Sequence, residues 1–243
     1  MGIRKGEGFI GEHDRDSFTP MPDHISAKAK DLSSLINGLL DTNGILQQAG
    51  YDPVLAAATI AFGFVFIHPL SDGNGRIHRY FIHHILTKMG YTKRGIIFPI
   101  SSAILDRIDK YQDILEHFSS WRVDLIEWKE TTYHNVAILN ETIDLYRYFD
   151  LTKQAEFLYE YVEDTIERII PAELDYLEKY DRMTQFINDH KTLPNTKVDL
   201  LIKFLDQNEG KLSKKKREKQ FEELGNKEIK IIEENFEEIF KNG

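Results

Sequence analysis

Apolar residues recur at helical spacing along most of the chain. Residues 25–40 place theirs near one face, which predicts an amphipathic helix. The next predicted helix begins at Asp52, a residue type that caps helices, followed by Pro53 at the first helical position. It is expected to end near Ile67, because Pro69 disfavours helical backbone at His68.

A further helix is predicted from about Gly75 or Arg76 up to Gly90. Its apolar residues recur every four positions, and we expect them to be buried: Ile77, Phe81, Ile85 and Met89. Helical patterns continue at 102–118, 124–149, 151–169, 171–190, 197–207 and 213–240. Residues 8–22 differ, because short β-prone pieces flank a polar turn before Pro20 and Pro22 close the segment, and this predicts a small β-hairpin.

The predicted fold class is therefore all-α, a helical bundle with a small β-hairpin flap at about residues 8–20. The C-terminal third is richer in charge but keeps helical spacing, so we expect it to be folded. We place a domain boundary near Asp150, which divides a domain at 1–150 from a helical extension at 151–243.

Composition excludes several classes of protein. The formal net charge of −9 provides no general attraction to nucleic acid or to an anionic membrane. The absence of cysteine excludes disulfides, cysteine-based zinc sites and thiol nucleophiles. The longest apolar stretch, residues 54–67, is too short to span a bilayer, and the first residues lack the apolar core of a signal peptide. We expect a cytoplasmic protein without a membrane partner.

One stretch carries candidate chemistry, HPLSDGNGRIHR at residues 68–79, between two predicted helices. The N–H groups of Gly73, Asn74 and Gly75 can form an anion-binding nest at the start of the second helix. Arg76 and Arg79 project from about the same face, and their planar side chains suit phosphate oxygens. The pattern predicts a site for a polyphosphate.

Two more side chains complete the predicted site. Asp72 supplies a hard carboxylate that suits Mg²⁺, and His68 can accept a proton near neutral pH. Together these residue types indicate nucleotidyl or phosphoryl transfer. Each has an ordinary structural explanation when taken alone, namely a turn, solvated arginines or a core histidine, and it is their joint occurrence that favours function.

Other motifs do not fit this stretch. An EF-hand loop starting at Asp72 would lack its oxygen ligand, its central glycine and its final glutamate. A Walker phosphate loop is absent. His78, His83 and His84 lack the spacing of zinc ligands, so we expect them at the surface or in packing contacts.

The stretch resembles the core motif of the Fic family, HxFx(D/E)GNGRxxR, with Leu70 in place of the usual phenylalanine. The hairpin segment, the helix from Asp52 and residues 90–120 also resemble parts of that family. The C-terminal helices resemble the extension of a bacterial Fic subgroup. The Doc-type branch, which phosphorylates its target, lacks the GNGR nest in this form.

The resemblance implies transfer of AMP from ATP to a Tyr, Thr or Ser hydroxyl of a target protein, with release of pyrophosphate. It implies that His68 is the base, that Asp72 holds Mg²⁺, and that the flap pairs with the target's main chain. It further implies that Gly73, Asn74 and Gly75 form the nest, that Arg76 holds the phosphates of the transferred nucleotide, and that Arg79 holds the γ-phosphate. Tyr111 matches a family tyrosine near the adenine, although Ser119 stands where asparagine is usual.

Many family members carry an inhibitory helix with the motif (S/T)xxxE(G/N). No match is found here, because the possible endings at Glu209 and Glu234 have Leu205 and Lys230 where Ser or Thr should stand. We expect either that an N-terminal segment has been removed or that a separate protein supplies inhibition, and we favour removal. The expected activity is transfer of AMP by a de-repressed form, rather than removal of AMP.

Two other classes of function stay open. The basic run at 211–217 suggests a DNA-associated regulator, although it also suits a solvated helix capped by Ser213, and nucleic acid is the less favoured partner. A catalytically silent nucleotide-binding module is the third hypothesis. A homodimer is left open.

Overall fold

The computed structural model describes residues 2–92 and 98–241. Met1, on which the expectation of a removed segment partly rests, and residues 93–97 of the Fic-like segment 90–120 lie outside the described residues. The chain divides into two compact units, residues 1–167 and 168–243, and each is described by itself. The sequence-based division near residue 150 stays a prediction.

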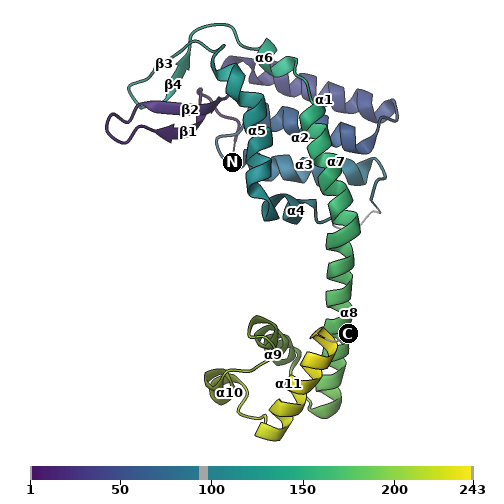
Figure 1. Cartoon of the computed structure of the whole chain (residues 1–243). Helices are drawn as coiled ribbons and strands as arrows, with labels where there is room; N and C mark the ends of the chain where they lie inside the picture. The colour runs from purple at the N-terminus through teal and green to yellow at the C-terminus, as the bar shows by residue number, and fades with distance from the viewer. Residues whose placement is uncertain (1, 93–97, 242–243) are drawn as a thin grey trace. The chain divides into compact units, whose positions relative to one another are not determined.

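The first unit is built around one central helix (Figure 1). α2 (Pro53–Ile67) is apolar on all sides and contacts α1, α3 and α7. A helix without a polar face belongs in a core. The helices of this unit are α1 (Leu32–Gln48), α2, α3 (Asn74–Lys88), α4 (Ile100–Asp106), α5 (Ile108–Val123), α6 (Asp144–Arg147) and α7 (Thr152–Asp164).

Both predicted ends of α2 are confirmed, and local chemistry explains them. The Asp52 carboxylate accepts hydrogen bonds from the N–H groups of Val54 and Leu55, each at 2.9 Å, and Pro53 occupies the first turn. The helix ends at Ile67, two residues before Pro69. The central helix is thus specified by residues at its own ends.

The predicted flap is confirmed as an antiparallel hairpin of β1 (Phe9–His13) and β2 (Pro20–Ile25). Its turn is held by the Asp14 carboxylate, which accepts hydrogen bonds from Ser17 N and Ser17 Oγ, both at 2.8 Å. Pro20 and Pro22 lie within β2 and do not close the segment before it, because proline is tolerated in a strand at the edge of a sheet. Helices otherwise dominate the structure, so the predicted fold class, all-α with a small hairpin, is confirmed.

The prediction of a helix at 124–149 is wrong. The segment forms a second hairpin of β3 (Trp128–Glu130) and β4 (Val136–Ile138), followed by the short α6. Two contacts stabilise the extended backbone: Ile138 N donates to Glu7 Oε2 at 2.6 Å, and Glu127 N donates to Asn140 Oδ1 at 3.0 Å. The contact with Glu7 spans 131 positions, so no local pattern could show it.

Other predicted helices shift or divide. Residues 25–40 begin in extended form and as a 3₁₀ turn (Ala29–Asp31), so α1 starts at Leu32. The pattern at 102–118 divides at Arg107 into α4 and α5. α3 starts at Asn74. Of the four residues predicted to be buried, Ile85 is buried, whereas Ile77, Phe81 and Met89 are half-buried. The buried face is therefore rotated from the predicted one and consists of Asn74, His78, Ile82, Ile85 and Leu86. His78 Nδ1 donates to Ala61 O at 2.8 Å, and this bond favours the rotated face.

A π-helical turn (Thr165–Ile169) follows α7 and leads into α8 (Ile170–His190). The second unit contains α8, α9 (Asn195–Gln207), α10 (Lys214–Gln220) and α11 (Asn226–Lys241), with a hydrophobic core of its own. The helix predicted at 213–240 divides because Phe221 leaves helical backbone and enters this core. Within the described part of the chain, every helix is too short or too polar to cross a bilayer.

Candidate active site

His68 is the residue immediately after α2. Its backbone is left-handed, with φ 53° and ψ 57°, and its N–H donates to Phe64 O at 3.1 Å. This conformation is uncommon for a residue with a side chain, but Pro69 disfavours the ordinary helical alternative. The turn leaves His68 in the wall of a cavity.

Side chains from distant segments bind the last carbonyl groups of α2. His24 Nε2 lies 3.0 Å from Phe66 O. Arg4 donates from Nη2 to Ile67 O at 3.4 Å and from Nε to His68 O at 2.7 Å. Because the last carbonyls of a helix have no partner within the helix, these contacts stabilise its end.

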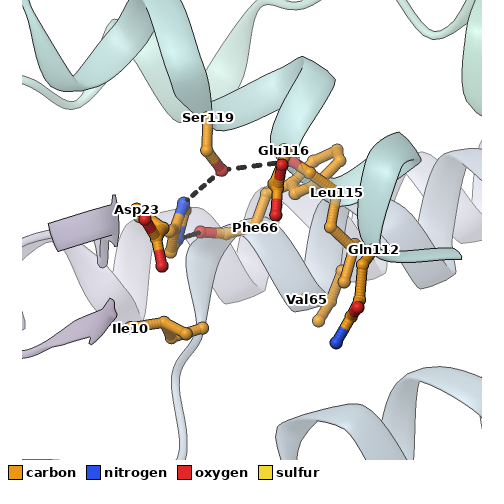
Figure 2. A pocket seen from close by; sticks show the side chains of 9 residues that line it. Ile10, Asp23, Val65, Phe66, Gln112, Leu115, Glu116 and Ser119 are labelled. Atoms are coloured by element: carbon orange, nitrogen blue, oxygen red, sulfur yellow. Dashed lines mark hydrogen bonds between the residues drawn. The ribbon is translucent and has the colours of Figure 1, made fainter. Parts of the chain in front are cut away.

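His24 is a neutral residue in the core beside His68, with ring centroids 6.2 Å apart. Burial lowers the pKa of His24 to about 3. The neutral ring donates from Nε2 to Phe66 O, so Nδ1 accepts from Ser119 Oγ at 2.9 Å (Figure 2). His24 therefore joins β2, α2 and α5 without carrying charge.

His68 is also neutral at physiological pH. Burial lowers its pKa to about 4, and the positive charge of Arg4 acts in the same direction, whereas the nearby Val65 carbonyl opposes the shift. Nδ1 is buried, so Nε2 is the nitrogen available to a bound molecule. A neutral imidazole at a cavity wall can accept a proton.

The loop after His68 is tied to the start of α3 by one side chain. Asn74 Oδ1 accepts from Leu70 N at 2.9 Å, and its Nδ2 donates to Leu70 O at 2.8 Å. Asn74 is 2% exposed. Gly73 adopts φ 90°, a region that favours glycine. The Asn74 side chain thus has a structural task, in addition to the main-chain role that the sequence predicts.

The start of α3 carries two arginines beside uncapped N–H groups. Gly73 provides no side-chain cap. A Cβ atom at Gly75 would lie 3.6 Å from Arg79 Nη1, so the Arg79 guanidinium lies beside the first turn. Arg76 Nη2 lies 2.9 Å from Asp72 Oδ2, and both side chains are largely exposed. The helix N-terminus and both guanidinium groups together favour an anion.

Asp72 is the candidate metal ligand. No group of three or more histidine, aspartate or glutamate side chains in the described ranges is placed to hold a metal ion. Mg²⁺ is compatible with a single protein carboxylate, because it keeps several waters and takes other ligands from substrate phosphates. Asp72 therefore fits a Mg²⁺ ion that arrives with a nucleotide, provided that Arg76 releases it.

Two cavities adjoin this region. One, of about 530 Å³, is lined by His68, Leu70, Ser71, Ser26 and residues 3–9. The other, of about 230 Å³, lies among the hairpin, α2 and α5, and Figure 2 shows its lining residues: Ile10, Asp23, His24, Val65, Phe66, Gln112, Leu115, Glu116 and Ser119. His24 connects the second cavity to His68.

The part of the chain that carries this site is similar to known proteins. Residues 3–86, which include the flap, α2 and most of α3, match the Fic/DOC family. This segment is a Fic/DOC family segment. A protein named protein adenylyltransferase fic-1, from Caenorhabditis elegans, is 28% identical over 101 residues of this chain. The match covers 41% of this chain but 17% of that relative, so the chain spans about a sixth of its length.

The structure places the predicted site residues of the motif around one loop, and it places Tyr111 in the core, close enough to Arg79 for the two side chains to interact. His68, Asp72, Arg76 and Arg79 lie in the Fic segment around one interhelical loop. Tyr111 is buried in the core, with its ring 5.6 Å from His78, and it does not line the cavity beside the flap. Burial raises the pKa of Tyr111 to about 12, with Arg79 acting in the opposite direction. Its role in nucleotide binding stays a prediction.

Sequence reasoning missed two residues that shape the site, Arg4 and His24. The alternation of residues 20, 22 and 24 along β2 is a signal that His24 points inward with the two prolines. Arg4 has no comparable signal, because its partner His68 is 64 positions away. A lone arginine in a glycine-rich segment looks like any solvated residue.

Proposed function

We propose that this chain transfers AMP from ATP to a hydroxyl group of a target protein. The observation that carries the proposal is a neutral His68 held at the end of α2, across one short loop from the arginine-bearing N-terminus of α3. A base beside an anion site is the arrangement that transfer of a phosphate-linked group requires. The name of the Caenorhabditis elegans relative supports the same chemistry.

In the proposed reaction, His68 Nε2 accepts the proton of the target's Tyr, Thr or Ser hydroxyl. The oxygen then attacks the α-phosphorus of ATP, the bond from that phosphorus to the β-phosphate oxygen breaks, and pyrophosphate leaves. A ring protonated at the buried Nδ1 leaves the Nε2 lone pair free for this step. The pKa of about 4 keeps His68 unprotonated at neutral pH.

The N-terminus of α3 would hold the phosphates. Main-chain N–H groups of Gly73, Asn74 and Gly75 would bind phosphate oxygens, and Arg76 and Arg79 would offset their charge. The two hydrogen bonds of Asn74 to Leu70 would keep the nest in shape while substrate enters and leaves. Each of these contributions is positional and electrostatic, as expected for phosphorus transfer.

Asp72 would hold Mg²⁺ once the nucleotide competes for Arg76, since a triphosphate carries more charge than a single carboxylate. Mg²⁺, when bound, offsets phosphate charge and orients the leaving group. The cavity beside His24 is the space that we assign to the nucleotide base, because apolar Ile10, Val65 and Leu115 line it with polar Gln112.

The flap would present the target. β1 is largely exposed, and among the described strands it pairs with β2 alone, so its other edge is open to an extended segment. Main-chain pairing there would bring a target hydroxyl toward His68. The expected partner is therefore a protein with an accessible, extended segment that carries Tyr, Thr or Ser.

The DNA-associated alternative is less favoured, because side chains of the basic run contact their own unit. Arg217 Nη2 lies 2.5 Å from the buried Glu233 Oε1, and Lys211 Nζ lies 3.8 Å from Glu233 Oε2. Lys216 Nζ lies 3.0 Å above the Phe204 ring. Positive groups used in this way contribute less to a surface for phosphates.

The test is labelling of a cell lysate with α-labelled and γ-labelled ATP in parallel, with Mg²⁺. Wild-type chain is expected to transfer the α label to protein, His68→Ala to lose it, and His84→Ala, an exposed histidine of α3, to retain it. Protein labelled from the γ position would instead indicate phosphoryl transfer. ATP binding without label from either position would indicate a silent module.

A further inference from the structure

The side chain of Arg4 is bound by main-chain carbonyl groups around the end of α2. Nε donates to His68 O at 2.7 Å, and Nη1 donates to Gly6 O at 2.7 Å. Nη2 donates to Ala27 O and lies 3.4 Å from Ile67 O. One guanidinium therefore joins the N-terminal residues, the segment after β2 and the end of α2.

The backbone of the same segment pairs with the loop beyond His68. Arg4 N donates to Pro69 O at 3.0 Å, and Ser71 N donates to Gly2 O at 3.1 Å. Ile3 and Leu70 form an antiparallel bridge. We name residues 2–8 the N-terminal strap. It contacts both sides of His68, the helix end before it and the loop after it.

The conformation of His68 needs such support. A left-handed backbone is unfavourable at a non-glycine residue such as His68, so it persists only where its surroundings favour it. The carbonyl end of a helix carries partial negative charge, which a cation offsets. Within the described ranges, all hydrogen bonds of the Arg4 side chain go to carbonyl oxygens, and two of the four acceptors, Ile67 O and His68 O, belong to this helix end.

We propose that Arg4 is the positioning residue of the site: its guanidinium holds the Ile67 and His68 carbonyls, fixes the left-handed turn at His68, and so aims the imidazole at the substrate. The transferase readouts below rest on the proposed function. The proposal that Arg4 fixes the backbone turn and the pKa of His68 does not rest on it, because both are properties of the free protein.

The charge of Arg4 has a second consequence. The ionisable groups around His68 are Arg4, on the strap, and His24, on β2, which stays neutral. Glu7 and Tyr146 in turn act on Arg4. Arg4 lowers the pKa of His68, so removing the charge raises that pKa, whereas a lysine that keeps the charge leaves it low.

Two substitutions separate geometry from charge. Arg4→Lys keeps the cation but loses the planar fork that reaches several carbonyls, and Arg4→Gln loses both. We expect both variants to lower kcat for AMP transfer by about tenfold or more, because each loses hydrogen bonds of a charged donor that hold the turn at His68. We expect KM for ATP to be nearly unchanged, because Arg4 is not in the phosphate site.

The pKa of His68, measured by NMR of the ring nitrogens in the folded variants, separates charge from geometry, because both variants lose the planar fork but only Arg4→Gln loses the charge. It is expected to rise in Arg4→Gln and to stay near the wild-type value in Arg4→Lys. Lys88→Gln is the control: it removes one positive charge from an exposed position in the last turn of α3, outside both cavities, and neither kcat nor the pKa of His68 should change.

Wild-type kcat and an unchanged His68 pKa in both Arg4 variants would overturn the proposal. Loss of the folded state in both would also overturn it, because Arg4 would then hold the fold rather than His68. If the wild-type chain shows no transfer at all, the proposed function fails, and the NMR comparison still decides whether Arg4 controls the state of His68.

Discussion

Asn74 offers the sharpest test of how the loop is built. Asn74→Ala removes two hydrogen bonds to Leu70, at 2.9 and 2.8 Å, and leaves the Leu70 N–H and carbonyl without them. At about 1 kcal/mol for each bond, the free energy of unfolding should fall by about 2 kcal/mol. For a unit of this size, that corresponds to a fall in Tm of about 4–8 °C.

The control is Asn43→Ala. Asn43 Oδ1 also accepts a hydrogen bond, from Gln47 Nε2 at 2.7 Å, but within one turn of a surface helix. Such pairs contribute about 0.2–0.5 kcal/mol, and alanine offsets the loss through its higher helix propensity.

Thermal unfolding followed by circular dichroism compares the two variants with the wild type. If Asn74→Ala melts within about 1 °C of Asn43→Ala, the loop does not depend on the Asn74 side chain and the reasoning is wrong. Asn74→Ala should also transfer AMP more slowly, because the loop that carries Asp72 loses its hydrogen bonds to the start of α3.

Acid should destabilise the first unit, because burial lowers the pKa of three histidines to about 3 or 4: His24, His68 and His78. Below about pH 6.5 the histidines of the unfolded chain bind protons, whereas those of the folded chain do not. Tm should therefore fall as the pH drops from about 6.5 to 4. A Tm that stays constant from pH 7 to 5 would contradict this. Asp72→Ala should change Tm by less than about 1 °C, because its ion pair with Arg76 is exposed, but should abolish Mg²⁺-dependent labelling. Gly11→Ala should distort the flap and lower transfer, since a Cβ atom there would lie 2.1 Å from Met21 O; Gly8→Ala, with open space around it, should leave transfer unchanged in the same labelling assay.

Much of the fold follows from local signals. Asp52 and Pro53 specify the start of α2, Pro69 favours its end, and continuous apolar character places it in the core. The site motif was equally readable, because His68 and the start of α3 are joined by a short loop, so their neighbourhood follows from chain connectivity alone.

Periodicity was less informative where tertiary contacts decide. The apolar spacing at 124–149 suits a helix, yet the Glu7 carboxylate holds Ile138 in a strand. In α3, the hydrogen bond from His78 to Ala61 favours a face one position away from the predicted one. Local energies for either choice differ little, so one long-range hydrogen bond can determine the result.

The sequence by itself determined where the central helix begins and ends, and it predicted which residues surround the candidate phosphate site. Only the tertiary structure decided how His68 is held and how its charge is set. Arg4 and His24 reach the end of α2 from 64 and 42 positions away, and both contact main-chain carbonyls, which every residue carries. Any residue type can provide a main-chain acceptor, so the sequence does not indicate which residues accept these hydrogen bonds. The contacts become visible only when the folded chain brings donor and acceptor together.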